Sequence, residues 1–331
     1  MSPSPSVAVA VVSWNTRGDL SACLQSLEEH AHAGRAEVWV VDNASTDGSA
    51  AMVRRRFGWA ELIASEENVG YGAAVNLIAA RTDTPWIAAA NADVQVWDGA
   101  LQALLDAGQR EPGAGAIAPR LVLPERNQEL SVQAFPTVRC ALVAALGLQR
   151  VVPGLGERLL LPPHWYTEGG RGVDWALGSF LLLRRSAFDA VGGFDERQWM
   201  FAEDIDLCWR LREAGWITWY EPRATVTHRS GAATTKAWGE ERNLRGIRSV
   251  YAWMVRRRGL AHTRAYAAVS LAGLGARAAG LAPAAALRPA RHAALRDAYR
   301  RWWRLHRAGL QHAGKGTEEG PEPDRRATTS Q

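Results

Sequence analysis

The stretch Pro85-Trp-Ile-Ala-Ala-Ala-Asn-Ala-Asp-Val-Gln-Val-Trp-Asp98 decides the fold that the sequence predicts. Residues 86–90 form an apolar run too short for a core helix. The polar group Asn91-Ala92-Asp93 ends the run, and helical periodicity follows it. This order is typical of a central parallel strand in a doubly wound α/β sheet, where ligands bind just beyond the strand ends.

Two polar side chains stand at the end of this predicted strand. Asn91 and Asp93 lie two residues apart, so an extended backbone would point both to one side. There an amide oxygen and a carboxylate could meet a divalent metal that carries a diphosphate. A helix cap is the alternative, because Asx residues at a strand-to-helix junction often satisfy the first free amides of the helix. The tripeptide alone leaves both interpretations open.

A strand, helix and second strand are predicted at the start of the chain. Residues 7–12 form a buried strand that opens into Ser13-Trp14-Asn15-Thr16, residues 19–30 form a helix, and residues 37–41 form a strand that ends at Asp42. Short links between such elements indicate a right-handed parallel unit. Asp42 would then lie at the nucleotide-binding edge and accept a hydrogen bond from a base or ribose. Simple turn chemistry is the alternative role.

Glycines follow a short third strand at residues 62–64. Gly70 and Gly72 open a helix that ends near Arg81, and they permit close approach of the backbone to a ligand at a helix start, where free amides favour phosphate. The glycine spacing of the dinucleotide fingerprint is absent after the first strand, which counts against a nicotinamide enzyme. The glycine-rich, lysine-containing loop of a sugar-phosphate nucleotidyltransferase is also missing there.

The middle of the chain is less regular. A helix is expected at 99–109 and a strand at 116–123. Residues 124–172 show weak periodicity and indicate a variable insertion over the site rather than a second domain. A strand at 174–183 follows, and its glycine, Gly178, would let substrate approach.

A helix from Phe201 to near Gly215 begins with two acids, Glu203 and Asp204. Its apolar face leaves both in the first turn, where the helix dipole favours carboxylates. Such a pair could supply a base, although dipole complementation alone would explain it. His228 directly follows two predicted strands at 216–227 and is a candidate metal ligand or base. Most lone histidines are neither.

These segments together resemble the inverting glycosyltransferases of family 2 with the GT-A fold, in particular bacterial rhamnosyltransferase-like members. The resemblance covers roughly residues 7–232 and rests on the order of seven motifs, not on any one. The motifs are Val11–Asn15, Val41–Gly48, Glu67–Gly70, Asn91–Asp93, Gly192–Glu196, Glu203–Leu207 and His228. It implies an α/β fold with a Rossmann-like, mostly parallel central sheet flanked by helices, followed by a basic helical extension.

The resemblance also implies catalytic roles. Asp93 would bind Mg²⁺ or Mn²⁺ bridging the donor diphosphate, and His228 matches a histidine that completes the metal shell in some relatives. Asp204 matches the catalytic base, with Glu203 beside it. Asn91 stands at the first position of the family's Asp-X-Asp motif, and its amide brings no negative charge.

The implied donor is a dTDP- or UDP-linked sugar, most simply rhamnose. The implied acceptor is a glycan or a polyprenyl-diphosphate-linked glycan of cell-envelope synthesis. Expected donor contacts are Ser13, Asn15, Asp42, Asn68, Gly70 and Asn91, and expected acceptor contacts are Trp175, Gly178 and Trp199. The alternative is a non-catalytic nucleotide- or glycan-binding protein on the same fold, which only Asn91 supports.

The C-terminal third is basic. Between Arg242 and Arg307 there are many arginines and one acidic residue, Asp297. Amphipathic helices of this composition suit an anionic membrane surface. Packing on the catalytic domain is an equally good interpretation of the periodicity. Nucleic acid is not expected as a partner, because the sequence lacks the motifs of nucleic-acid readers.

The predicted organisation is a disordered start (1–6), a catalytic domain (7–237), a helical extension (238–312) and a disordered tail (313–331). The first residues lack the basic and apolar regions of a signal peptide. Three scattered cysteines indicate neither a disulfide framework nor a zinc site. The expectation is therefore a cytoplasmic protein, peripheral at the inner face of the plasma membrane.

Overall fold

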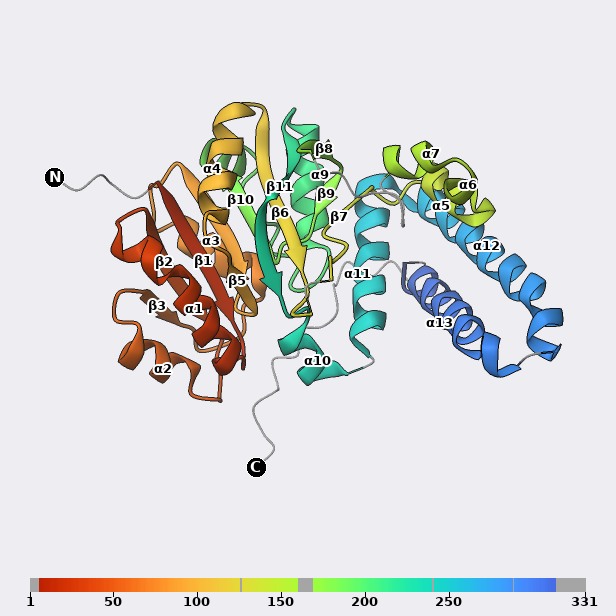
Figure 1. Cartoon of the computed structure of the whole chain (residues 1–331), viewed down its shortest axis with the longest axis horizontal. Helices are drawn as coiled ribbons and strands as arrows, with labels where there is room; N and C mark the ends of the chain where they lie inside the picture. The colour runs from red at the N-terminus through yellow and green to blue at the C-terminus, as the bar shows by residue number, and fades with distance from the viewer. Residues whose placement is uncertain (1–5, 126, 160–168, 240, 288, 314–331) are drawn as a thin grey trace. The chain divides into compact units, whose positions relative to one another are not determined.

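A computed structural model describes residues 6–125, 127–159, 169–239, 241–287 and 289–313. These residues divide into two compact units (Figure 1). The sheet unit holds the described residues up to Gln133 and from 169 to 239, and the helical unit holds the remainder. The predicted disordered ends lie outside the described residues, except for Ser6 and Ala313.

A mixed β-sheet forms the centre of the sheet unit, in the order β3-β2-β1-β4-β10-β6-β11-β5, with β8 beside β11. Strands β3, β2, β1 and β4 run parallel, while β10 runs antiparallel between β4 and β6. The strands are β1 (Val7–Ser13), β2 (Ala36–Asp42), β3 (Glu61–Ala64), β4 (Trp86–Asn91), β5 (Val94–Val96), β6 (Ala114–Val122), β8 (Arg171–Val173), β10 (Phe180–Arg184) and β11 (Ile217–His228). Strands β7 (Val132–Gln133) and β9 (Trp175–Ala176) pair separately.

Helices flank this sheet and complete the predicted α/β architecture (Figure 1). They are α1 (Arg17–His32), α2 (Ser49–Arg56), α3 (Tyr71–Ala79), α4 (Ala100–Arg110), α8 (Arg185–Ala190), α9 (Glu203–Glu213) and α10 (Ala232–Trp238). Residues 7–11 of β1 are fully buried on both faces, which explains why this strand shows no polar alternation. Leu20, Leu24 and Leu27 of α1 join the same core at helical spacing.

The structure corrects the prediction at the end of β4. The strand was expected to run directly into a helix, but Ala92 and Asp93 form a turn that leads into β5, which pairs with β11. Three residues are too few to show a period, so β5 leaves no clear sequence signal. Because the backbone turns here, alternation along a strand does not place Asn91 and Asp93 on one side.

Two further predicted strands have different limits in the structure. The predicted strand at 174–183 is divided into β9 and β10 by a loop that contains Gly178. The two predicted strands at 216–227 form the single strand β11, which keeps its pairing with β6 through a register shift between Glu221 and Thr225. A bulge of this kind bends a strand without ending it.

The helical unit contains α5 (Val138–Leu146), α6 (Leu148–Val151), α7 (Pro153–Arg158), α11 (Glu241–Arg258), α12 (Leu260–Leu287) and α13 (Pro289–Ala313). The predicted insertion therefore divides between the units, since residues 134–159 belong with the C-terminal helices. Close packing explains this grouping. The ring of Phe135 stacks on Trp253 at 6.0 Å, and a Cβ at Gly273 of α12 would collide with Ala145 of α5.

Helix α12 is long and apolar enough, over Leu260–Ala285, to cross a membrane by length and composition. Only 11% of its most apolar window is buried. A single helix of this type is weak support for a membrane span, because core helices of soluble proteins meet the same criteria.

Candidate active site

Three parallel strands end side by side at one edge of the sheet. Ser13 of β1 pairs in register with Asp42 of β2, and Val12 pairs with Asn91 of β4. The predicted donor-binding residues at these strand ends are therefore neighbours. The hydroxyl of Ser13 is fully buried and lies 3.1 Å from the hydroxyl of Thr16, so it holds the loop after β1 in place.

Asn15 joins the loops that follow β1 and β2. Its backbone N–H donates to Ser45 Oγ at 2.9 Å, and its side-chain oxygen accepts from the Thr46 N–H at 2.8 Å. Asn15 has a positive φ of 54°, a backbone conformation that asparagine tolerates better than most residues. These bonds fix the position of the loop that carries Asp42.

Asp42 presents an unused acceptor at this edge. The residue is 3% exposed, and burial raises the pKa of its carboxyl while hydrogen bonds from Ser45 oppose the rise. Its Oδ1 is buried with no hydrogen-bond partner among the described residues. Buried acceptors are rarely left unsatisfied. A ribose hydroxyl or a base N–H would satisfy this one.

Gly70 brings the donor side of the site to Trp199. It starts α3 with a φ of 87°, and a Cβ there would lie 2.4 Å from the Trp199 carbonyl oxygen. The indole N–H of Trp199 donates to the Asn68 carbonyl at 3.1 Å, and the Asn68 side chain accepts from the Gly70 N–H at 3.0 Å. Asn68 and Gly70, which were predicted to contact the donor, are thus held next to Trp199, which was predicted to contact the acceptor.

A histidine between two carboxylates lies beyond β4 and β11. His228 Nδ1 is 2.7 Å from Glu129 Oε2, and Nε2 is 3.4 Å from Asp93 Oδ1. Burial would lower the pKa of His228, but hydrogen bonding and the charges of Asp93 and Glu129 raise it to about 9. Glu129 was not predicted. It lies 99 residues from His228 in a weakly periodic segment, and no local pattern marks it.

This arrangement fits a divalent cation. Glu129 holds Nδ1, so Nε2 faces Asp93, as in metal sites where a carboxylate orients a ligating histidine. Nε2 is buried, and Asp93 Oδ1 lies 3.4 Å from it. A cation between these atoms would displace the proton that the raised pKa of His228 keeps on the ring, because a metal binds the neutral imidazole. The described residues contain no group of three or more His, Cys, Asp or Glu that could hold a metal. Asp93 and His228 would therefore need substrate diphosphate and water as further ligands, which Mg²⁺ commonly uses.

Asp204 lies at the start of α9 and is held by two backbone amides. Gly178 N–H donates to its Oδ2 at 3.0 Å and Ile205 N–H donates to its Oδ1 at 2.7 Å. The phenol of Tyr71 in turn donates to the Gly178 carbonyl. Tyr71 was not predicted as a site residue, because its partner is 107 residues away.

Charges from two groups of carboxylates act on the phenol of Tyr71: Glu203 and Asp204 at the start of α9, and Asp93 after β4. Burial raises its pKa well above the usual range, and the charges of Glu203, Asp204 and Asp93 raise it further. The phenol is therefore within electrostatic range of both the predicted base and the predicted metal ligand.

A cavity of about 350 Å³ opens beside Asp93, near Asp19 and Thr227, and Asp204 does not line it.

The backbone directly before Glu203 and Asp204 is strained. Phe201 and Ala202, directly before Glu203, have φ values of 63° and 61°. Each costs on the order of 1–3 kcal/mol and is more common at functional sites. The other non-glycine residues with positive φ in the described ranges are Asn15, Ala44 and Ser230, which also lie in loops of this site.

Aromatic rings pack around α10 at the same end of the sheet unit. Trp238 contacts Trp14 at 6.1 Å, Trp199 at 6.2 Å and Phe201 at 5.8 Å between ring centroids. Trp175, also predicted to contact acceptor, lies in β9 opposite Gln133. Trp199 thus packs against other rings, which is the ordinary structural role of tryptophan.

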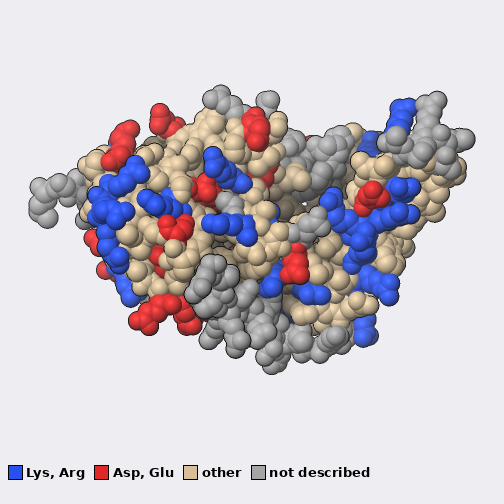
Figure 2. All heavy atoms as spheres, turned by 90° about the horizontal axis from the view of Figure 1, so that it is seen from below, with Lys and Arg blue, Asp and Glu red and all other residues tan. Residues whose placement is uncertain are grey.

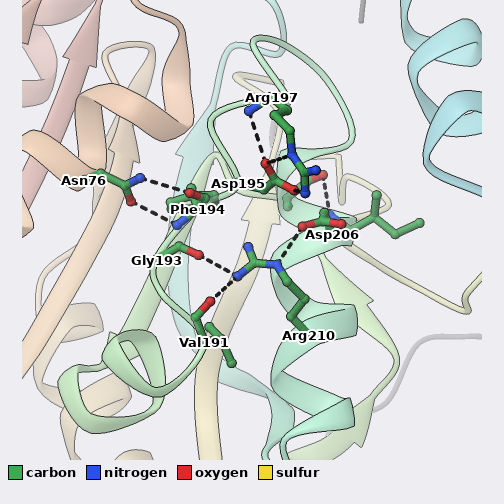
Figure 3. A network of polar contacts seen from close by, with 10 residues as sticks. Asn76, Val191, Gly193, Phe194, Asp195, Arg197, Asp206 and Arg210 are labelled. Carbon is green, nitrogen blue, oxygen red and sulfur yellow. Dashed lines mark hydrogen bonds and ion pairs between the residues drawn. The ribbon is translucent and has the colours of Figure 1, made fainter. Parts of the chain in front are cut away.

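The loop 192–196, which carries the Gly-Gly-Phe-Asp-Glu motif, is held by a buried ion pair (Figure 3). Arg210 Nε lies 2.7 Å from Asp206 Oδ2, and its Nη1 donates to the carbonyls of Val191 and Gly193, each at 2.7 Å. Asn76 of α3 makes two 2.9 Å bonds to the backbone of Phe194. The contacts of Arg210 and Asn76 therefore hold this loop in place before α9.

Arg210→Ala should lower the free energy of unfolding by about 3–5 kcal/mol, because it leaves a buried carboxylate without its ion-pair partner. Asp206 is fully buried and Arg210 only 16% exposed. Denaturant unfolding measures the loss. Arg212→Ala is the control, since its pair with Asp174 is longer (3.5 Å) and exposed, and it should cost about 0–1 kcal/mol. Equal losses in the two variants would contradict the role of Arg210.

Glu203→Gln should stabilise the protein increasingly as pH rises. Burial, and then the charge of Asp204, raise the pKa of Glu203 to about 8, whereas a glutamate in the unfolded chain has a pKa of about 4.3. The native state therefore holds a proton that the unfolded state releases, and the wild type loses stability between these two pKa values. Denaturation at pH 4 and pH 8 should show a variant advantage at pH 8 only. An advantage that is equal at both pH values would contradict this reasoning.

Comparison with known proteins identifies the family of this chain. Residues 8–135 match the family described as "Glycosyl transferase family 2", and residues 158–251 match "Glycosyltransferase like family 2". An N-acetylglucosaminyl-diphospho-decaprenol L-rhamnosyltransferase of Mycobacterium tuberculosis is 37% identical over 213 residues, covering 60% of this chain and 67% of the relative. The chain belongs to glycosyltransferase family 2.

A second relative and one solved structure are also similar to this chain. Rhamnosyltransferase WbbL of Escherichia coli is 50% identical over 56 residues, 17% of this chain and 21% of that protein. A mannosyltransferase from Pyrobaculum calidifontis, solved with GDP-Man and Mn²⁺, superposes with a TM-score of 0.59 at 21% identity, covering 95% of this chain and 87% of its own. This likeness shows the GT-A fold that the sequence predicted.

Proposed function

We propose that this family 2 glycosyltransferase is inverting and metal-dependent, and that it moves rhamnose from a nucleotide diphospho-sugar to a lipid-linked glycan of the cell envelope. The main support is that one loop, at Gly178 and Ser179, joins the predicted metal ligands to the predicted base. The Asn91 N–H, two residues before Asp93, donates to the Ser179 carbonyl at 2.9 Å, and the Gly178 N–H donates to Asp204 Oδ2 at 3.0 Å. The names of the two rhamnosyltransferase relatives support the choice of sugar, and the name of the Mycobacterium tuberculosis relative supports the choice of acceptor.

The donor would bind along the strand-end edge. The buried Oδ1 of Asp42 accepts a hydrogen bond from the nucleoside. Gly70 and Gly72, predicted to let a ligand approach the start of α3, instead make room for Trp199 and Phe194. Asp93 and His228 Nε2 would hold Mg²⁺ or Mn²⁺ against the diphosphate. When bound, that cation stabilises the negative charge that grows on the leaving group. Asn91 contributes no charge, so Asp93 carries the acidic role of the motif alone.

Asp204 would act on the acceptor. An inverting transfer needs a base that removes the proton of the acceptor hydroxyl while its oxygen attacks the anomeric carbon opposite the leaving diphosphate. Two backbone N–H groups fix the carboxylate of Asp204 and leave lone pairs to receive that proton. Burial raises its pKa and so increases its basicity.

The helical unit would place the enzyme at the cytoplasmic face of an anionic membrane. Figure 2 shows basic side chains, in blue, gathered over the helical unit, and in the described residues of this unit all of them are arginines. Residues 289–313 contain six arginines and one acidic residue, and Trp302 is 49% exposed. Arginine and interfacial tryptophan side chains are typical of helices that lie on such membranes.

A screen of nucleotide sugars tests the proposal. dTDP-rhamnose and UDP-hexoses are incubated with the protein and an N-acetylglucosaminyl-diphospho-lipid, with and without Mg²⁺ or Mn²⁺, and the released nucleoside diphosphate is measured. Release from dTDP-rhamnose that requires metal and acceptor supports it. Binding of nucleotide with no transfer from any donor would instead favour the non-catalytic alternative.

A further inference from the structure

An apolar groove lies between α12 and α13, wholly within the helical unit. It has a volume of about 350 Å³ and is lined by Leu274, Gly275 and Ala278 of α12 and by Tyr299, Arg300, Trp303 and Arg304 of α13. Its exposed lining is almost entirely apolar. Volumes of this size fall within the range of small-molecule sites.

Small residues of α12 leave the space open. A Cβ built at Gly275 would meet no atom within 4 Å, and Ala278 lies one turn along the same face. Trp303 forms a wall of the opposite side and is 36% exposed. The groove is therefore accessible to a narrow apolar chain.

Positive charge borders the groove. Arg300 and Arg304 are exposed and lie one turn apart on α13, where both line the groove. Residues 260–287 of α12 contain two arginines and no acidic residue, and the one acid of α13, Asp297, lies 3.7 Å from Arg296. Guanidinium pairs of this kind favour phosphate oxygens, which they bind with charge-assisted hydrogen bonds.

We propose that this groove binds the chain of an isoprenoid diphosphate, with Arg300 and Arg304 contacting the phosphate groups next to it. An apolar channel beside two arginines matches a molecule with one narrow hydrocarbon chain and an anionic head. The inference rests on the proposed function, because such a lipid would carry the glycan acceptor. It assigns the hydrocarbon chain and the phosphates to residues of the helical unit, whereas Asp93 and Asp204 belong to the sheet unit.

Binding of farnesyl diphosphate to the full chain tests the groove, measured by calorimetry below the micelle concentration of the lipid. EDTA is present so that binding through Asp93 and a metal does not contribute. Farnesol and inorganic diphosphate are compared as chain alone and head alone. Gly275→Leu fills the groove, and Gly280→Leu is its control, because it lies on the same helix, outside the groove, and its Cβ also meets nothing within 4 Å.

Gly275→Leu should weaken farnesyl diphosphate binding about tenfold or more, and Gly280→Leu should leave it unchanged. Replacing Arg300 and Arg304 together with glutamine should remove the preference for farnesyl diphosphate over farnesol. Replacing Arg291 and Arg301, which do not line the groove, should preserve it. Equal binding by wild type and Gly275→Leu would overturn the proposal, and so would binding to phosphatidylglycerol vesicles without binding to monomeric farnesyl diphosphate.

The two proposals can fail separately. If Gly275→Leu binds the lipid normally while the enzyme still transfers sugar, the groove is not the lipid site and the proposed function stands. If the groove variants lose lipid binding but wild type transfers no sugar, the proposed function fails and the groove remains a lipid site. Asp93→Ala should bind farnesyl diphosphate as wild type does in either case.

Discussion

Asp204→Asn should lower kcat by a factor of about 10²–10⁴ while leaving donor affinity nearly unchanged. The amide matches the carboxylate in shape but has no lone pair basic enough to take the acceptor proton. Donor contacts are expected elsewhere, at Asp42, Asp93 and His228. Steady-state transfer kinetics and calorimetry with the unreacted donor measure the two effects separately.

The contacts of Asp204 dictate the controls. Gly178 N–H and Ile205 N–H each donate to a different oxygen, so the asparagine NH₂ must face one of these donors. Unfolding experiments must therefore show that the variant is folded at the assay temperature. Glu203→Gln keeps both amide bonds of Asp204 and should retain far more activity. Normal turnover by Asp204→Asn would exclude it as the base.

The sequence predicted those parts of the site that local patterns mark. Asp42 and Asn91 follow uninterrupted apolar runs, and parallel strands bring such ends to one edge, as β1, β2 and β4 do here. The acidic start of α9 was also confirmed, because a helical apolar face fixes which residues fall in its first turn.

The parts that the sequence did not predict depend on contacts between distant segments. Glu129 reaches His228 across 99 residues, and Tyr71 reaches Gly178 across 107 residues. Periodicity describes only neighbouring residues, so it gives no information on such pairs. The turn at Ala92 and the strand β5 were missed because they are too short. A strand of three residues shows no period.

Asp93→Ala should weaken metal-dependent donor binding by at least about a hundredfold. The carboxylate of Asp93 would hold the cation, and the binding of the cation to the donor diphosphate contributes several kcal/mol. Calorimetry with the nucleotide sugar, with and without Mn²⁺, measures the loss. Any binding that remains in EDTA should equal that of wild type, because the nucleoside contacts at Asp42 are retained. The defect should therefore appear only when metal is present.

Variants of two neighbouring carboxylates, Glu129 and Asp19, distinguish coordination of the metal by Asp93 from a general effect of negative charge. Glu129→Gln removes the group that orients His228 and should cost about 10–100-fold in metal affinity, a smaller loss than that of Asp93→Ala. Asp19 lines the same cavity as Asp93 but lies beside Arg229 at 3.0 Å. Asp19→Asn should thus leave the Mn²⁺ dependence intact. If Asp19→Asn and Asp93→Ala weakened binding equally, the acidity of the cavity as a whole, rather than coordination by Asp93, would explain the effect of metal.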